Sequence, residues 1–220
     1  MFTVSPSLYS CDFLHLADQL DALAGIDTLH LDIDDGNFVR GISFGMELVN
    51  QVAAYTDISL DAHIESRDPM QFAEPLCRAG VWLVTAHIEA LAYPSLFLST
   101  IHSYGRKTGL ALNIKTPVSV LEPYVDQLDQ IILVSVEADC DGIVFRKGVL
   151  KKIRDAKAML GPSVQVWVDG GVNDCNFREI VEAGADGVVM GRAIFAAKNP
   201  LVALKHYCEL GKELAAKRDG

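Results

Sequence analysis

The chain alternates between short apolar runs and longer stretches in which apolar residues recur every three or four positions. The first pattern predicts buried strands, and the second predicts amphipathic helices. The predicted strands span residues 2–5, 28–33, 58–64, 81–88, 107–112, 130–136, 164–168 and 187–190. The predicted helices span residues 13–24, 46–55, 69–79, 94–104, 118–125, 148–160, 176–183 and 200–216.

Eight strands that are each followed by a helix predict a (β/α)8 TIM barrel, an α/β fold with one parallel sheet. The chain contains no linker, no low-complexity segment and no long run of charge. Barrels of about this length commonly form one domain. We therefore expect residues 1–220 to form a single TIM-barrel domain.

Composition narrows the range of partners. The formal net charge is −10, and an acidic protein is a poor partner for nucleic acid, because phosphate backbones bind basic surfaces. No apolar run approaches the length of a membrane span, and no secretory signal is visible. The five cysteines are widely spread and form no C-x-x-C pair. We expect a cytoplasmic protein with reduced thiols and no membrane partner.

The stretch 30–36, HLDIDDG, is the most informative segment of the chain. Alternate residues of a strand point to the same face, so His30, Asp32 and Asp34 are expected to share one face at the end of a strand. The next predicted strand repeats this spacing with Asp61, His63 and Glu65. Imidazoles and carboxylates that converge in this way are typical of metal or acid–base chemistry.

In a TIM barrel the active site lies at the carboxyl ends of the strands. Ser7, Ser135, Glu137 and Asp169 also fall at predicted strand ends. His87 and Glu89 do too, and we expect them to support the site or pack beside it. A single strand-end histidine is often only a structural residue. Two such strands together with Asp169 favour a divalent metal ion such as Zn, Mn, Fe or Co.

Glycines follow the last two predicted strands, as Gly170-Gly171 and as Gly191 before Arg192. TIM barrels often bind phosphate there through backbone N–H groups. Arg192 adds a forked donor that suits phosphate or carboxylate. Glycine also simply makes turns, but its position in this fold favours a phosphate site.

At these residues the chain resembles the ribulose-phosphate 3-epimerase family. The family pattern P-S-x-L-S-x-D-F corresponds to PSLYSCDF at residues 6–13, and H-x-D-x-M-D-G-x-F corresponds to HLDIDDGNF at 30–38. The pattern D-x-H-L-M corresponds to DAHIE at 61–65, and V-D-G-G-V-N is intact at 168–173. The resemblance covers nearly the whole chain, and these motifs together are specific.

The resemblance implies a role for each matching residue. The metal ligands it implies are His30, Asp32, His63 and Asp169. It also makes Asp32 and Asp169 the acid–base pair of a proton transfer through an enediolate, and it makes Ser7 a substrate contact. From the resemblance and the strand ends together, we expect the substrate to contact Ser7, His63, Gly142, Gly170, Gly171, Gly191 and Arg192.

The chain departs from the family pattern around the expected substrate. Three positions at which the family usually has methionine are Asp34, Glu65 and Val134. The family's phosphate loop N-P-G-F-G-G-Q corresponds to EADCDGI at 137–143, where only Gly142 is retained, and Arg192 replaces a serine. These changes favour a shifted substrate with the proton-transfer residues retained, and they make Asp34 and Glu65 candidate specificity residues.

The leading hypothesis is a metal-dependent 3-epimerase of a ketose phosphate similar to ribulose 5-phosphate, with one divalent metal ion as its cofactor. A lyase or decarboxylase of the same barrel type is an alternative, although the two histidines disfavour it. A non-catalytic relative that binds a sugar phosphate is another, supported by the altered loop at 137–143. By analogy with the family, we expect a homo-oligomer.

Overall fold

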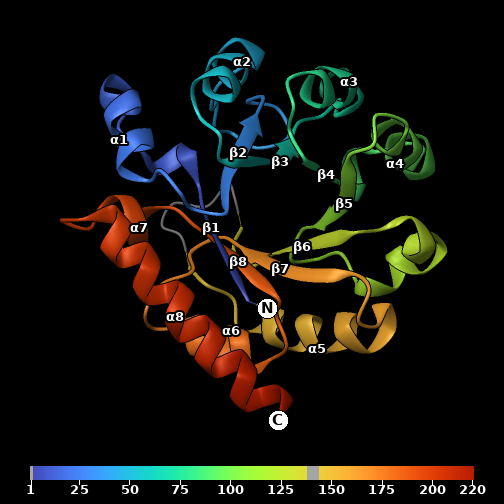
Figure 1. Ribbon diagram of the computed structural model, residues 1–220. Helices are drawn as coiled ribbons and strands as arrows, with labels where there is room; N and C mark the ends of the chain where they lie inside the picture. The colour runs from blue at the N-terminus through green and yellow to red at the C-terminus, as the bar shows by residue number, and fades with distance from the viewer. Residues whose placement is uncertain (1, 138–143) are drawn as a thin grey trace.

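The structure of the protein is a computed structural model that describes residues 2–137 and 144–220. Parallel strands form the centre of the protein. The strands form one eight-stranded sheet in the order β1-β8-β7-β6-β5-β4-β3-β2. A parallel bridge between Ser7 and His30 joins its two ends, so the sheet curves into a barrel (Figure 1). The strands are β1 (Thr3–Pro6), β2 (Thr28–Asp34), β3 (Ser59–Glu65), β4 (Leu83–His87), β5 (Lys107–Leu112), β6 (Gln130–Val134), β7 (Gln165–Asp169) and β8 (Gly187–Met190).

Helices surround this barrel and cover the outer face of the sheet (Figure 1). The α-helices are α1 (Leu16–Ala22), α2 (Met46–Tyr55), α3 (Met70–Arg78), α4 (Pro94–Ser103), α5 (Gly148–Leu160), α6 (Phe177–Glu182), α7 (Arg192–Phe195) and α8 (Pro200–Asp219). The 3-10 helices are η1 (Leu8–Ser10), η2 (Phe13–His15), η3 (Ile88–Ala90) and η4 (Val118–Gln127). The alternation of strand and helix confirms the predicted (β/α)8 fold.

Side-chain alternation along the strands separates two apolar layers. Leu29, Leu31 and Ile33 of β2 are buried in the large cluster that includes residues of the surrounding helices. A smaller cluster contains Trp167 and Val134 and is formed by residues of β5 to β8 together with Val136, which follows β6. Because odd and even positions of a strand face opposite sides, the polar residues 30, 32 and 34 face away from the outer layer.

Several predicted bounds differ from those observed, for local reasons. The predicted helix at 13–24 begins as η2, where the Asp12 side chain accepts a hydrogen bond from the Leu14 N–H. The predicted helix at 118–125 is the 3-10 helix η4, and it contains Pro123, which has no N–H to donate to an α-helical ladder. The strand predicted at 81–88 is shorter, because η3 begins at Ile88.

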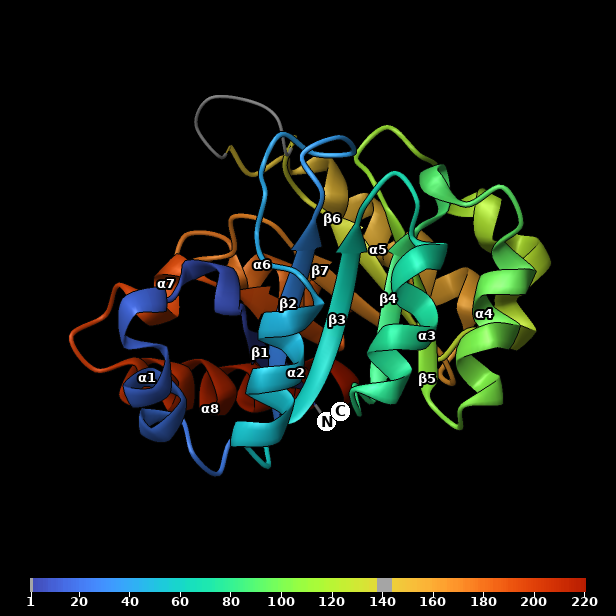
Figure 2. The same ribbon diagram turned by 90° about the horizontal axis from the view of Figure 1, so that it is seen from above.

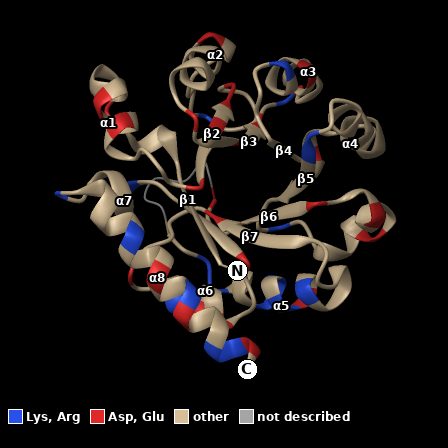
Figure 3. Cartoon of the chain, in the orientation of Figure 1, with Lys and Arg blue, Asp and Glu red and all other residues tan. Residues whose placement is uncertain are grey.

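Charge is distributed unevenly over the described part of the chain. Figure 3 shows Lys and Arg mainly on outer helices such as α5 and α8, whereas Asp and Glu occur both on outer helices such as α1 and α8 and at strands around the centre of the barrel. No helix within residues 2–137 and 144–220 is long and apolar enough to cross a membrane. The cysteines in these ranges are free thiols, namely Cys11, Cys77, Cys175 and Cys208.

Candidate active site at the carboxyl ends of the strands

A cavity of about 570 Å³ opens at the carboxyl ends of the strands. The arrowheads of β2 and β3 point to this edge in Figure 2. The predicted residues that line the cavity are Ser7, Asp32, Asp34, Glu65, Asp169, Gly170, Gly171, Gly191 and Arg192. His30 and His63 are fully buried beside these residues. Gly142 and the rest of the segment 138–143, with its two aspartates, lie outside the described residues.

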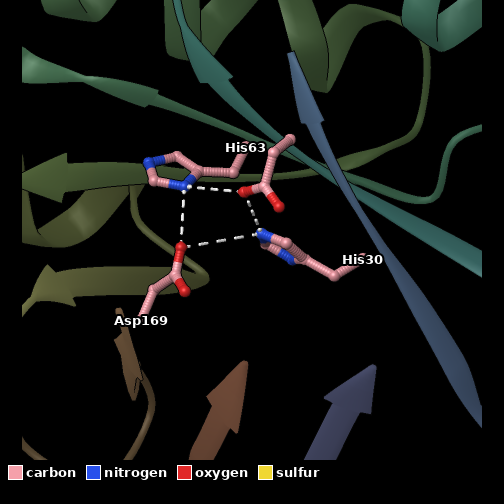
Figure 4. A group of neighbouring side chains, drawn as sticks. His30, His63 and Asp169 are labelled. Carbon is pink, nitrogen blue, oxygen red and sulfur yellow. Dashed lines mark hydrogen bonds and ion pairs between the residues drawn. The ribbon is translucent and has the colours of Figure 1, made fainter. Parts of the chain in front are cut away.

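Four side chains from three strands bring one donor atom each to a common point (Figure 4). The His30 Nε2 atom lies 3.1 Å from Asp32 Oδ1 and 4.0 Å from Asp169 Oδ2. The His63 Nδ1 atom lies 3.7 Å from the same Asp32 oxygen and 3.3 Å from the same Asp169 oxygen. We call His30, Asp32, His63 and Asp169 the four-donor cluster.

The donors of the four-donor cluster fit a divalent metal ion. Bonds from a metal such as zinc to nitrogen and oxygen are about 2.0–2.2 Å, which separates neighbouring ligand atoms by roughly 3–3.5 Å. Neutral imidazole with carboxylate suits Zn, Mn, Fe or Co, and three strands of a rigid barrel hold the donors in place. The fold therefore brings together the four residues that strand alternation, the strand-end position of Asp169 and the family resemblance together predicted as ligands.

Asp61 orients His30 from the side of the ring that faces away from the four-donor cluster. The sequence did not identify this role. The His30 Nδ1 atom is hydrogen-bonded to Asp61 Oδ1, which leaves Nε2 for the cluster. The other Asp61 oxygen accepts bonds of 2.7 Å from Ser5 Oγ and from Thr28 Oγ1. The β2–β3 register, which pairs His30 with Asp61, creates this contact. A carboxylate behind a histidine is a frequent partner of metal ligands.

Each aspartate of the four-donor cluster is held by its second oxygen. Ser7 Oγ donates a 2.5 Å hydrogen bond to Asp32 Oδ2, so the predicted substrate contact also positions this carboxylate. The Gly170 N–H donates a 2.6 Å bond to Asp169 Oδ1. Both aspartates are thus fixed with one oxygen directed at the cluster, which is the geometry that preorganised ligands or proton carriers need.

Charge interactions within the four-donor cluster shift the pKa values of both histidines and of Asp32. Burial lowers the pKa of His30, but Asp61 and Asp32 outweigh it and raise that pKa well above its usual value. Burial is likewise outweighed at His63, whose pKa rises to about 10 because its hydrogen bond to Asp169 and its interaction with Asp32 favour the charged imidazole. The histidines hold the pKa of Asp32 below its usual range despite its burial. A bound metal would displace these imidazole protons.

A second pair of carboxylates lines the same cavity. The sheet register places Asp34 of β2 directly beside Glu65 of β3. Burial, and then the charges of Glu65 and Asp32, raise the pKa of Asp34 to about 8. Burial raises the pKa of Glu65, but the contact with His87 and the charge of His63 outweigh it and lower that pKa. One wall of the cavity is therefore acidic.

His87 and Glu89 lie behind this acidic wall. The His87 Nε2 atom is 3.4 Å from Glu65 Oε1, and its Nδ1 atom is 3.1 Å from Glu89 Oε2. Glu89 in turn accepts a 2.9 Å hydrogen bond from the Asn113 N–H. The ring of His87 also stacks on that of His63, with centroids 4.9 Å apart. These contacts match the supporting role expected of His87 and Glu89.

Backbone conformation and close packing explain in part why glycines occupy the other end of the cavity. Gly170 and Gly171 have φ values of 97° and 66°, which favour glycine with or without a ligand. At Gly191 an added Cβ would clash with Ser10 Oγ. Arg192 begins the short helix α7 and lines the cavity. The structure brings these residues together at one end of the cavity.

Comparison with known proteins gives consistent matches. Residues 3–195 match the sequence model of the Ribulose-phosphate 3 epimerase family. The chain is 36% identical to a ribulose-phosphate 3-epimerase of Mycobacterium tuberculosis, over 91% of this chain and 89% of the relative. It is 37% identical to a chloroplastic ribulose-5-phosphate-3-epimerase of Arabidopsis thaliana, over 92% and 74%. It is 34% identical to a ribulose-phosphate 3-epimerase of Bacillus subtilis, over 89% and 93%.

Proposed function

The chain belongs to the ribulose-phosphate 3-epimerase family, and from this premise we propose that it is a metal-dependent 3-epimerase of a ketose phosphate, with D-ribulose 5-phosphate as the reference substrate. The observation that carries the proposal is the four-donor cluster, in which His30, Asp32, His63 and Asp169 meet beside one cavity. The family is one of carbohydrate epimerases, which are isomerases.

In the proposed reaction, Asp32 and Asp169 transfer protons at C3 of the substrate. One carboxylate accepts the C3 proton, and the electrons of the C–H bond form the double bond of a planar enediolate. The other aspartate, as the acid, returns a proton to the opposite face, which inverts C3. Asp32 comes from β2 and Asp169 from β7, so the two groups approach from different sides of the barrel.

The four-donor cluster would hold the metal ion. Such an ion supplies Lewis-acid stabilisation of the negative charge that develops on the substrate oxygens. We infer that it is Zn, Mn, Fe or Co, since the donors are imidazoles and carboxylates. Ser7 would hold Asp32 in position throughout the reaction, because its hydroxyl is bonded to the Asp32 oxygen that faces away from the cluster.

The phosphate would bind at the end of the cavity formed by Gly170, Gly171, Gly191 and Arg192. Arg192 supplies positive charge there, and its forked donors suit phosphate oxygens. His63 would contact the substrate beside the metal.

We also propose that the protein is a homo-oligomer and lies in the cytoplasm, and the family resemblance supports this proposal. Light scattering of the purified protein tests the oligomeric state.

Metal reconstitution tests the proposed function. The protein is stripped with a chelator and then reloaded with Zn, Mn, Fe or Co, and its epimerisation of D-ribulose 5-phosphate is measured at each step. We expect one bound ion per chain and activity that returns with at least one metal. Asp32→Asn and Asp169→Asn should each lower kcat at least about 1,000-fold, because each removes one proton carrier.

Asp35→Asn is the matched control, since Asp35 follows directly on β2 but bonds the N–H groups of Asn37, Phe38 and Arg67. Its activity should stay within about threefold of the wild type. A protein that binds metal and ketose phosphate without turnover would instead support the non-catalytic alternative. Carbon–carbon cleavage or release of CO₂ would support the lyase alternative.

A further inference from the structure

Asp34 and Glu65 are cavity residues that the proton transfer proposed above does not use. They lie side by side because the register of β2 and β3 pairs them directly. Both line the cavity that contains Asp32 and Asp169. The Asp34 Oδ1 atom is buried and has no hydrogen-bond partner among the described residues. Buried polar atoms are nearly always paired, so this acceptor in a cavity wall is available to a hydrogen-bond donor of a bound molecule.

Glu65 is held in this wall from behind. His87, whose side chain is fully buried, places Nε2 3.4 Å from Glu65 Oε1, and Glu89 holds the opposite side of the ring. The Asn113 N–H bond to Glu89 ties this row of contacts to the loop after β5. A side chain fixed in this way is a preorganised acceptor, which loses little entropy when it binds a donor.

The position of the pair in the barrel indicates which part of a ketose phosphate it meets. In the closed strand order, β3 lies across the barrel from β7 (Figure 1). Gly170 and Gly171 follow β7 on one side of the cavity, whereas Glu65 ends β3 on the other. The four-donor cluster draws on β2, β3 and β7 and lies between them. A substrate with its phosphate beside β7 and C3 at the cluster directs its remaining end toward Glu65.

We propose that Asp34 and Glu65 form a subsite that binds the hydroxymethyl group at the end of the ketose opposite the phosphate, which is C1 in a 2-ketose 5-phosphate. This inference rests on the proposed function and deepens it. Carboxyl oxygens accept the hydrogen bond that a C1 hydroxyl donates, and a substrate without that hydroxyl leaves the buried acceptors unpaired. The pair therefore selects 1-hydroxy ketoses against their 1-deoxy analogues, since sites built around a hydrogen bond reject the analogue that lacks it.

The test compares D-ribulose 5-phosphate with 1-deoxy-D-ribulose 5-phosphate on the metal-loaded enzyme. Loss of the C3 proton in D₂O, followed by NMR, gives kcat/KM for each compound without a coupling enzyme. We expect the wild type to prefer the hydroxylated compound by at least about 100-fold. Asp34→Leu and Glu65→Met should reduce this preference to below about tenfold, mainly through a higher KM for the hydroxylated compound.

Conservative variants separate hydrogen bonding from simple packing. Asp34→Asn and Glu65→Gln keep an acceptor oxygen and should retain most of the preference. Asp35→Asn, whose side chain faces the backbone of the following loop, should leave the preference unchanged. Metal content measured on each variant shows that the four-donor cluster is intact.

The outcomes distinguish this inference from the proposed function. Exchange of both compounds by the wild type with similar kcat/KM overturns the subsite and leaves the epimerase proposal standing. An unchanged preference in both Asp34→Leu and Glu65→Met also overturns the subsite. Exchange of neither compound by the metal-loaded wild type contradicts the proposed function itself, and the subsite with it.

Discussion

The two nitrogens of His30 face different partners, and this division decides what the residue can do. Nδ1 is bonded to Asp61, while Nε2 faces Asp32 and Asp169. Alternation along β3 places Asp61 and His63 on one face, so the sequence suggests that both lie near the site. The sequence does not show that Asp61 is hydrogen-bonded to His30, because that contact depends on the register between two strands.

Asp61→Asn should therefore weaken metal binding about 10–100-fold without removing a ligand, since carboxylates behind metal-bound histidines typically contribute this much. Competition with a fluorescent chelator measures the affinity. Ser5→Ala serves as the control, because Ser5 contacts the Asp61 oxygen that faces away from His30, and it should lose less than about fivefold. Equal affinity of Asp61→Asn and the wild type would show that Asp61 does not orient the ligand.

At the scale of elements, the apolar pattern predicted the strands and most helices well. The observed bounds of α2, β5, α5 and β8 are those predicted. These segments have long or uninterrupted patterns between clear turn residues. The short helices η1, η3 and α7 were not predicted, because segments of three or four residues are too short for a periodic signal.

Part of the candidate site was predictable from the sequence pattern of the strands. Alternation along β2 and β3 placed His30, Asp32 and His63 on the face that forms the four-donor cluster. The contact between Glu65 and His87 was not predictable, since it depends on how two long side chains turn inside a packed barrel. Local sequence pattern determines which face a residue occupies, and tertiary packing determines which atom it meets.

The close approach of β7 and β8 can be tested at Gly187. An added Cβ there would lie 2.6 Å from the ring of Trp167, which is buried in the smaller apolar cluster. Gly187→Ala should lower the free energy of unfolding by about 1–3 kcal/mol, because this region has no room for another methyl group. Urea denaturation followed by circular dichroism measures the change.

Gly148→Ala is the comparison, since an added Cβ at the start of α5 has no atom within 4 Å. It should leave stability unchanged or raise it by up to about 1 kcal/mol, as expected for alanine in place of glycine in a helix. Equal stability of the two variants would contradict the tight packing at Trp167.

At the scale of the whole molecule, the four-donor cluster joins strands from both halves of the chain. His30, Asp32 and His63 come from β2 and β3, whereas Asp169 comes from β7, more than 100 positions later. A metal ion bound by all four side chains would therefore tie distant parts of the barrel together. Its binding free energy would add to the stability of the folded state alone.

Metal removal should lower the melting temperature. At a free metal concentration 100 times Kd, a single site contributes about 2.7 kcal/mol, and for a protein of this size that corresponds to roughly 5–10 °C. Differential scanning fluorimetry with chelator and with added Zn or Mn measures the shift. The melting temperature of Asp169→Asn should change much less between the two conditions. An identical melting temperature of the wild type with chelator and with added metal would contradict a four-ligand site.

The cavity is proposed to transfer a proton at C3 of a ketose phosphate. NMR of D-ribulose 5-phosphate in D₂O with the metal-loaded protein tests this proposal most directly. We expect the C3 proton to be replaced by deuterium and D-xylulose 5-phosphate to appear, both at least about 1,000-fold more slowly with Asp32→Asn or Asp169→Asn. A protein with one metal ion per chain that leaves the C3 proton in place would contradict it.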